Sequence, residues 1–180
     1  MNIEIVDDFL SDYQCDSIGD FLASKDMMWR FNKDLNDTGY VGNYYFYYYV
    51  VMQYFDPQKN YVEHEFLPAF QPLLDKLGID LSQIWRLKVN LYPGTQRRFH
   101  HQSHTDYEPG NGLRTCLYFP HTTNAPVVFH LGRWRRRSIK CKRNRLLLFD
   151  GSNRHHSTSP TDLNYTANTL NYCSIFVRFV

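Results

Sequence analysis

The sequence predicts an α+β fold that is mostly β, in which N-terminal helices support an antiparallel sandwich or barrel. Helical periodicity is confined to the first half of the chain. From residue 85 onward, short stretches with the alternation typical of strands follow one another, separated by turns. The 180 residues suffice for one domain with its own core. We therefore expect a single domain, with a helical and aromatic support over 1–84 and a β core over 85–180.

Two helices are expected in the support. Ser11 can cap a helix that runs to about Ser24. A second helix is expected within 61–78, where apolar residues recur at helical spacing and Gly78 can end it. The prolines inside this stretch favour a late start or a kink. Between the two helices, the aromatic stretch 43–51 favours a strand that packs under the barrel.

Short strands are expected throughout the β core. In the first of them, WRLKVNLY, apolar and polar residues alternate as in a half-buried strand, and Pro93-Gly94 then breaks the pattern. Regular spacing between turns favours antiparallel pairing over a parallel sheet. The candidates are 85–92, 100–106, 114–119, 126–131, 145–150 and 169–179.

Composition excludes several classes of protein. No apolar run is long enough to cross a bilayer, and the N-terminus has neither a basic region nor an apolar one as in a signal peptide. The four cysteines lie far apart without a CxxC pair, which favours reduced thiols over a zinc knuckle or a disulfide framework. We expect a cytoplasmic protein, in the host cytoplasm if it is viral.

Charge and histidine are distributed unevenly. Residues 1–96 contain seven Lys/Arg against fourteen Asp/Glu, whereas residues 97–180 contain thirteen against four. Seven of the eight histidines lie between His100 and His156. We therefore expect metal-binding or catalytic residues in the basic, histidine-rich half.

His104-Thr105-Asp106 is the tripeptide that indicates a metal site. Side chains at i and i+2 of a strand share a face, so this imidazole and carboxylate can bind one ion. The third ligand has to come from elsewhere, and His155 and His156 follow the apolar strand 145–150. Two histidines and one carboxylate leave open positions on the metal, as in non-haem Fe(II) oxygenases.

Motifs over most of the chain resemble the Fe(II)- and 2-oxoglutarate-dependent oxygenases, especially small prolyl-4-hydroxylase-like members of phages and bacteria. They are IVDDFLS, RLKVNLYPGT, HHQSHTD, RTCLYF, NRLLLFDGSNRHHSTSPTD and TLNY, in the order that such proteins show. The resemblance implies a double-stranded β-helix, a jelly roll of the cupin type, with Fe(II), 2-oxoglutarate and O₂ as cofactor and cosubstrates.

The resemblance also implies roles for individual residues. His104, Asp106 and His155 match the metal ligands, because the family pattern counted from Phe149 reaches His155, and His156 then lies on the opposite face. Tyr92 matches the tyrosine whose hydroxyl contacts the cosubstrate. A tyrosine there could also be part of the core, but Lys88 and Asn90 on the same strand face are polar, which favours the cosubstrate role.

One expected residue is missing from the sequence. The family holds the distal carboxylate of 2-oxoglutarate with Arg or Lys about eleven residues past the distal histidine. Thr166 and Ala167 occupy the matching positions here. A dicarboxylate in a water-poor barrel requires a cation. We expect another cation to supply the charge, the best candidate being Arg114, with Thr115, Thr166 or Asn168 donating hydrogen bonds. Alternatively, the cosubstrate differs or binds weakly, or the site has become a binding pocket.

The basic segment, residues 132–145, contains eight Lys/Arg and no acidic residue. It could be a solvated hairpin, it could bind phosphates or single-stranded nucleic acid with Trp134 stacking on bases, or it could bind an acidic protein.

Three functions are compatible with these features. The first is a 2-oxoglutarate-dependent dioxygenase that hydroxylates an unactivated C–H of a protein or peptide, a prolyl-type side chain by resemblance, and releases succinate and CO₂. The second is a nucleic-acid-demethylating oxygenase that uses the basic segment. The third is a non-catalytic jelly-roll module that binds anionic polymers. No membrane partner is expected.

Overall fold

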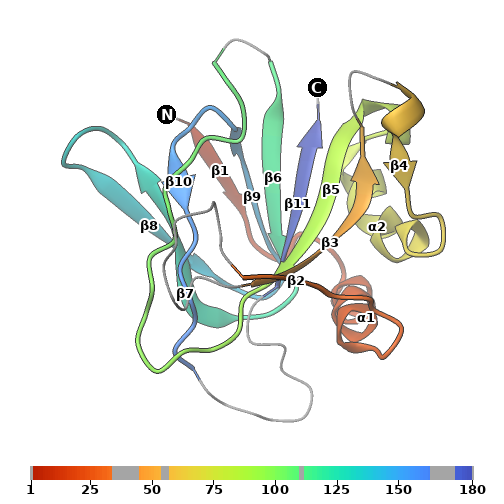
Figure 1. Ribbon diagram of the computed structural model, residues 1–180, viewed down its shortest axis with the longest axis horizontal. Coiled ribbons are helices and arrows are strands. Elements are labelled where there is room, and N and C mark those ends of the chain that lie inside the picture. Colours follow the sequence, from red (N-terminus) through yellow and green to blue (C-terminus); the bar gives the residue numbers. More distant parts are fainter. Residues whose placement is uncertain (1, 34–44, 54–56, 110–111, 163–172, 180) are drawn as a thin grey trace.

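Two antiparallel sheets make up most of the protein (Figure 1). The computed structural model describes residues 2–33, 45–53, 57–109 and 112–162, and the backbone of 173–179. The large sheet has the strand order β1-β9-β6-β11-β5-β3-β2, with β4 paired to β3. Its strands are β1 (Ile3–Val6), β2 (Arg30–Asn32), β3 (Tyr45–Met52), β4 (Tyr61–Val62), β5 (Ile84–Leu91), β6 (Arg114–Phe119), β9 (Arg145–Asp150) and β11 (Cys173–Phe179).

The small sheet has the order β10-β7-β8. Its strands are β7 (Thr123–His130), β8 (Arg136–Cys141) and β10 (His155–His156). Two single-turn 3₁₀ helices, η1 (Pro57–Lys59) and η2 (Leu81–Gln83), lie between strands of the large sheet along the chain. The N-terminal half thus contributes strands as well as helices, because β1, β2 and β3 belong to the same sheet as the strands of the β core.

Both helices expected from the sequence are present. Helix α1 (Asp12–Ala23) begins with a capping box, in which Ser11 Oγ accepts from the backbone N–H of Gln14 and Gln14 Oε1 accepts from that of Ser11. Helix α2 (Leu67–Leu77) starts late, as its prolines favour, and ends at Gly78 with a φ of 66°. Neither helix of the described part is long and apolar enough to span a membrane.

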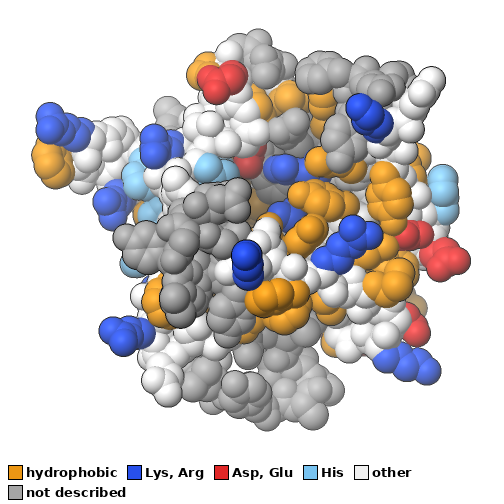
Figure 2. Space-filling view, in the orientation of Figure 1, with side chains coloured by type: hydrophobic (Ala, Val, Ile, Leu, Met, Phe, Trp, Pro, Cys, Tyr) orange, Lys and Arg blue, Asp and Glu red, His pale blue; other side chains and the backbone are white. Residues whose placement is uncertain are grey.

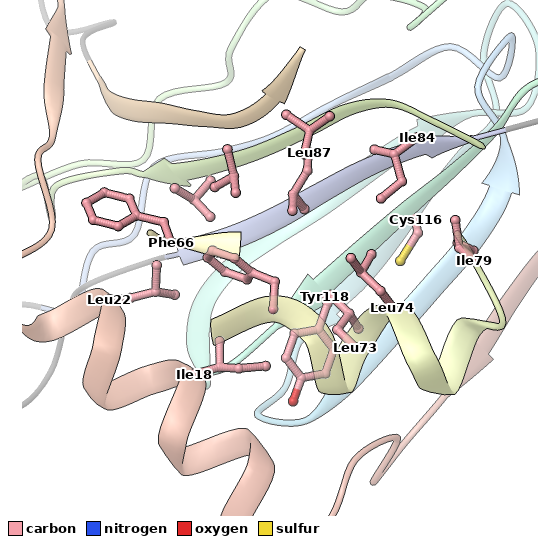
Figure 3. Packing of buried hydrophobic residues seen from close by; sticks show 14 of the residues in the cluster. Ile18, Leu22, Phe66, Leu73, Leu74, Ile79, Ile84, Leu87, Cys116 and Tyr118 are labelled. Carbon is pink, nitrogen blue, oxygen red and sulfur yellow. The ribbon is translucent and has the colours of Figure 1, made fainter. Parts of the chain in front are cut away.

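The helices cover one face of the large sheet (Figures 1 and 3). Ile18 and Leu22 of α1 and Leu73 of α2 are fully buried against this face, where the sheet contributes Leu87 and Tyr118. A second apolar cluster lies between the two sheets. Its members include Leu117, Phe119, Val127, Phe129, Ile139, Leu147 and Phe149. Because side chains alternate along a strand, successive residues of the large sheet pack either against the helices or into the cluster between the sheets.

Segment 100–106 is not the regular strand that alternation predicts. It forms isolated antiparallel bridges, His100 with Thr158 and His104 with His155. Between these bridges three residues (101–103) lie opposite two (156–157), so the register shifts by one. The extra residue acts as a bulge, which interrupts the ladder and reorients the side chains that follow it.

The basic segment divides into two parts in the structure. Arg145 forms a bidentate pair with Asp7, at 2.6 and 2.9 Å, and Arg143 contacts Asp12 at 2.7 Å and Asp16 at 2.6 Å. The Arg145 guanidinium lowers the pKa of Asp7 to about 2. The other part forms the exposed turn after β7 and the strand β8, most of whose side chains are exposed. Arg143 and Arg145, at the end of the basic segment, thus form ion pairs with the acidic N-terminal segment.

Asn144 should be a fold-determining residue. It is 1% exposed and has a φ of 60°; its side chain accepts from Leu10 N–H at 2.8 Å and from the Tyr118 hydroxyl at 2.9 Å, and donates to Leu10 O at 2.7 Å. Asn144→Ala should lower the free energy of unfolding by about 3 kcal/mol, because it leaves buried groups unpaired and places Ala at positive φ. Urea denaturation measures this loss.

Tyr118→Phe is the matched control for Asn144→Ala. It removes only one of the three hydrogen bonds and should cost about 1 kcal/mol. Equal losses in the two variants would contradict the role assigned to Asn144.

Candidate metal centre

Three potential metal ligands converge beside the core between the sheets. Nε2 of His104 lies 3.8 Å from Oδ1 of Asp106, and Nε2 of His155 lies 3.9 Å from Oδ2. The ligand atoms of the three residues all lie within 4.8 Å of one another. Within the described ranges, no other group of three or more His, Cys, Asp or Glu side chains comes together in this way.

Backbone hydrogen bonds bring these residues together. His104 N–H donates to His155 O and His155 N–H donates to His104 O, both at 2.9 Å. The N–H of Asp106 donates to Gly151 O at 2.8 Å. Segment 104–106 is therefore joined to both ends of the turn that connects β9 to β10.

Both imidazoles are oriented by their second ring nitrogen. His104 Nδ1 lies 3.2 Å from Gln102 O, and His155 Nδ1 lies 2.8 Å from Asn153 O. A carbonyl can only accept, so each Nδ1 carries the proton in this arrangement and each Nε2 presents a lone pair towards Asp106. This is the tautomer that a metal ion requires.

The Asp106 carboxylate is held from two sides. Its side chain is 2% exposed. The Thr115 hydroxyl donates to Oδ2 at 2.7 Å, and Arg86 NH2 lies 3.8 Å from Oδ1. These contacts position the carboxylate as the contacts around a metal ligand usually do.

His155 is the more enclosed of the two imidazoles. It is 4% exposed and packs against Phe129 and Phe149, with ring centroids 5.6 and 5.1 Å away. Burial lowers the pKa of its imidazole. The ring is therefore kept in the neutral form that binds metal.

His156 lies on the other face of β10, as the count along the chain predicts. Its Nε2 is 3.1 Å from His100 Nδ1, and its Nδ1 is 2.9 Å from His130 Nε2. Burial, together with His130 and His100, lowers the pKa of His156 to about 4. The three rings form a hydrogen-bonded row outside the metal centre.

Of the other residues predicted to bind the cosubstrate, Tyr92 and Thr115 lie among the described residues, and Thr115 contacts a candidate metal ligand. Tyr92 is 7% exposed, directly after β5, and stacks on Tyr45 and His101 at 5.7 and 4.8 Å. Thr115 does reach the site, where it donates to Asp106. Thr166 and Asn168 lie outside the described residues.

The structure does not bring Arg114 to the centre, in contrast to the expectation that it supplies the missing cation. Thr115 is directed to Asp106, so the alternation of β6 directs the preceding residue to the opposite face. The Arg114 side chain is 49% exposed, and its guanidinium lies 3.8 Å from Glu4. Sequence spacing alone did not show which face of β6 meets the metal ligands.

The sequence indicated a polar face on this strand, but the missing cation was not assigned to the cations that do enter the space between the sheets. Arg86 and Lys88 lie on the face of β5 opposite Leu87 and Val89, which pack against the helices. Figure 2 shows cationic and hydrophobic side chains beside one another over β3 and β5, and histidines gathered over the small sheet. The signal was present in the sequence, because a face of β5 with successive polar residues cannot be part of an apolar core.

Lys88 has an environment unusual for a lysine. Its Nζ donates to the Tyr45 hydroxyl at 3.0 Å and lies 4.7, 5.1 and 5.4 Å from the ring centroids of Tyr45, Tyr47 and Tyr49. Burial is the main reason that its pKa falls to about 7; Arg86 lowers it further, and Asp106 opposes the shift.

Gly151→Ala should weaken metal binding. A Cβ at this position would lie 2.3 Å from Tyr107 Cε1 and 2.5 Å from Thr115 Oγ1, which displaces the hydroxyl that holds Asp106. We expect about tenfold weaker Mn(II) binding by calorimetry. Thr115→Val should have a similar effect, whereas Ser152→Ala, in the same turn, should have none. Unchanged affinity in Gly151→Ala would show that Thr115 does not support the centre.

Lys88→Met should change how stability depends on pH. The folded pKa of about 7 lies below the ordinary 10.5. Below about pH 7 Lys88 is charged in both states, and the buried charge destabilises the folded wild type. As the pH rises from about 7 to 10.5, the folded state loses this charge first, so the free energy of unfolding of wild type increases. The variant's advantage in free energy of unfolding should therefore shrink over this range. Burial raises the pKa of Tyr45 to about 12, outside this range. Denaturation at several pH values measures the difference; exposed Lys140→Met should give none, and a constant difference for Lys88→Met would contradict the burial of its charge.

Comparisons with known proteins reveal relationships of structure only. No protein-family model and no curated sequence matches this chain. A prolyl-4-hydroxylase from Pseudomonas putida is 12% identical, with a TM-score of 0.60 over 98% of this chain and 91% of that one.

Two further solved structures are similar. A prolyl hydroxylase from Trichoplax adhaerens, in complex with a peptide of hypoxia inducible factor, is 16% identical with a TM-score of 0.59, over 98% of this chain and 83% of that one. The epimerase SnoN, in complex with Fe³⁺, α-ketoglutarate (2-oxoglutarate) and nogalamycin RO, is 11% identical with a TM-score of 0.59, over 98% and 78%. These likenesses confirm the mostly β jelly-roll fold, the double-stranded β-helix of 2-oxoglutarate-dependent oxygenases.

Proposed function

We propose that the chain is an Fe(II)- and 2-oxoglutarate-dependent dioxygenase that hydroxylates an unactivated C–H bond. The observation that supports this most directly is the convergence of His104, Asp106 and His155, with both Nε2 atoms and the carboxylate facing one point. Two imidazoles and one carboxylate form the set of ligands typical of non-haem Fe(II) oxygenases.

The residues present fit Fe(II). The two imidazoles, each oriented by a carbonyl at Nδ1, and the buried carboxylate would hold it on one side. Bound Fe(II) with 2-oxoglutarate and O₂ supplies oxidative decarboxylation, in which one oxygen atom enters succinate as CO₂ leaves and the other enters the hydroxyl group of the product.

The protein's own residues would orient and protect this chemistry. Thr115 and Arg86 keep the Asp106 carboxylate in place, and the two backbone carbonyls fix the imidazole tautomers. Phe129 and Phe149 cover the inner side of His155, which excludes water from that side of the metal.

We propose a peptidyl, prolyl-type side chain as the substrate. Two of the similar structures are prolyl hydroxylases, and one of them holds a peptide, which supports a peptide as the first substrate to test. SnoN was solved with nogalamycin RO, so this fold also occurs with a ligand of another kind.

We also propose a reducing compartment, such as the cytoplasm, as the place of action. Cys15, Cys116 and Cys141 are buried and free. Free thiols and Fe(II) both persist where the environment is reducing.

Release of succinate tests the proposed function. Protein supplied with Fe(II), 2-oxoglutarate, O₂ and proline-containing peptides should form succinate, and the peptide should gain one oxygen atom by mass spectrometry. His155→Ala should reduce both signals to the level without protein, because the metal loses a ligand. Peptides with Ala in place of Pro are the matched substrate control.

His64→Ala is the matched protein control, since His64 is an exposed histidine far along the chain from the metal centre. It should behave as wild type. Succinate formation that is unchanged in His155→Ala would reject the metal centre, and succinate without peptide oxidation would reject the substrate but not the enzyme class.

A further inference from the structure

The inner face of β5 contains a lysine without a matching anion. Among the described residues, no carboxylate oxygen lies within 4.0 Å of Lys88 Nζ, and its hydrogen-bond partner is the neutral Tyr45 hydroxyl. Three tyrosine rings of β3 lie beside the ammonium group and restrict its contact with water. A cation partly removed from water with no carboxylate in contact is unfavourable. Its presence in the space between the sheets is therefore explained best by an anionic ligand.

Lys88 lies close to the metal centre along β5. Arg86, two residues earlier on the same face, lies 3.8 Å from Asp106. One step of two residues along a strand is about 7 Å. Lys88 is thus one such step from the residue that touches a metal ligand. A short dicarboxylate with one end at the metal has its other end in this region.

Asn90 is a second, independent sign of a ligand. Its side chain continues the same face of β5, is 8% exposed, and its Oδ1 has no hydrogen-bond partner among the described residues. Buried side-chain amides are nearly always hydrogen-bonded. Since rotation exchanges the amide oxygen and nitrogen, Asn90 can direct its NH₂ group to an anion.

We infer that Lys88 holds the distal carboxylate of 2-oxoglutarate, with Asn90 beside it, in place of the cation that the sequence lacks after the distal histidine. This inference rests on the proposed function. It assigns the anchor to β5, which precedes the metal ligands in the chain, instead of to the strand that follows them. A neighbouring carboxylate would stabilise the ammonium group, and Tyr45 would fix its direction.

Binding to the Mn(II)-loaded protein tests the assignment without turnover. Calorimetry compares 2-oxoglutarate with 2-oxobutanoate, which has the same metal-binding end but no distal carboxylate. Lys88→Met should weaken 2-oxoglutarate binding about 30-fold or more and leave 2-oxobutanoate binding unchanged within about threefold. Lys88→Arg, which retains the charge, should preserve the preference for the dicarboxylate.

The controls separate Lys88 from other cations. Lys140→Met makes the same substitution on exposed β8, and Arg114→Gln removes the cation favoured by sequence spacing; both should bind 2-oxoglutarate as wild type does. Arg178→Gln tests a cation whose backbone lies in register with Arg86, and it should also bind normally.

The outcomes distinguish the inference from the proposed function. Wild type that binds neither acid with Mn(II) would overturn both. Wild type that prefers 2-oxoglutarate, together with a Lys88→Met variant that keeps the full preference, would overturn the inference alone, as would loss of the preference in Arg114→Gln or Arg178→Gln. The ratio of the two affinities within one variant is independent of the fraction folded, and Lys88→Arg serves if Lys88→Met does not fold.

Discussion

The reciprocal pair of backbone hydrogen bonds between His104 and His155 is the interaction on which the candidate site depends. These two bonds join segments that are about fifty residues apart in the chain. Because the backbones are fixed to each other, the two imidazoles reach Asp106 from defined directions. The third ligand depends on a further backbone bond, from Asp106 to Gly151, at a position where the chain approaches Tyr107 and Thr115 too closely for any side chain.

The large sheet has two faces with different tasks. The face towards the helices is apolar and provides stability, as the burial of Ile18, Leu73 and Tyr118 shows. The inner face is apolar along β6 and β9 but polar along β5, where it carries Arg86, Lys88 and Asn90. Buried polar groups reduce stability unless they are paired. The protein tolerates them beside the metal ligands, where a charged ligand would pair with them.

The uneven charge of the chain has a partly structural explanation. Arg143 and Arg145 form ion pairs with Asp7, Asp12 and Asp16. Basic residues of the second half of the sequence therefore bind the acidic N-terminal segment. Asn144, between the two arginines, anchors the same segment by hydrogen bonds to Leu10. The exposed cations of β8 and of the turn before it are not used in this way. Of the histidines, His104 and His155 belong to the metal centre, and His100, His130 and His156 form the row.

The sequence by itself determined the fold class, both helices, most strands and the residues that converge as candidate ligands. These features follow from local rules: periodicity, capping, and the spacing of His104, Asp106 and His155. It did not predict the irregular pairing of 100–106, because a bulge depends on the partner segment. Nor did it place the cations correctly: Arg114 and Thr115 are adjacent in sequence yet face opposite sides of β6, and Lys88 reaches the inner space from a strand that precedes the metal ligands. Only the tertiary structure decided these points, since it alone sets which face of each strand meets the other sheet.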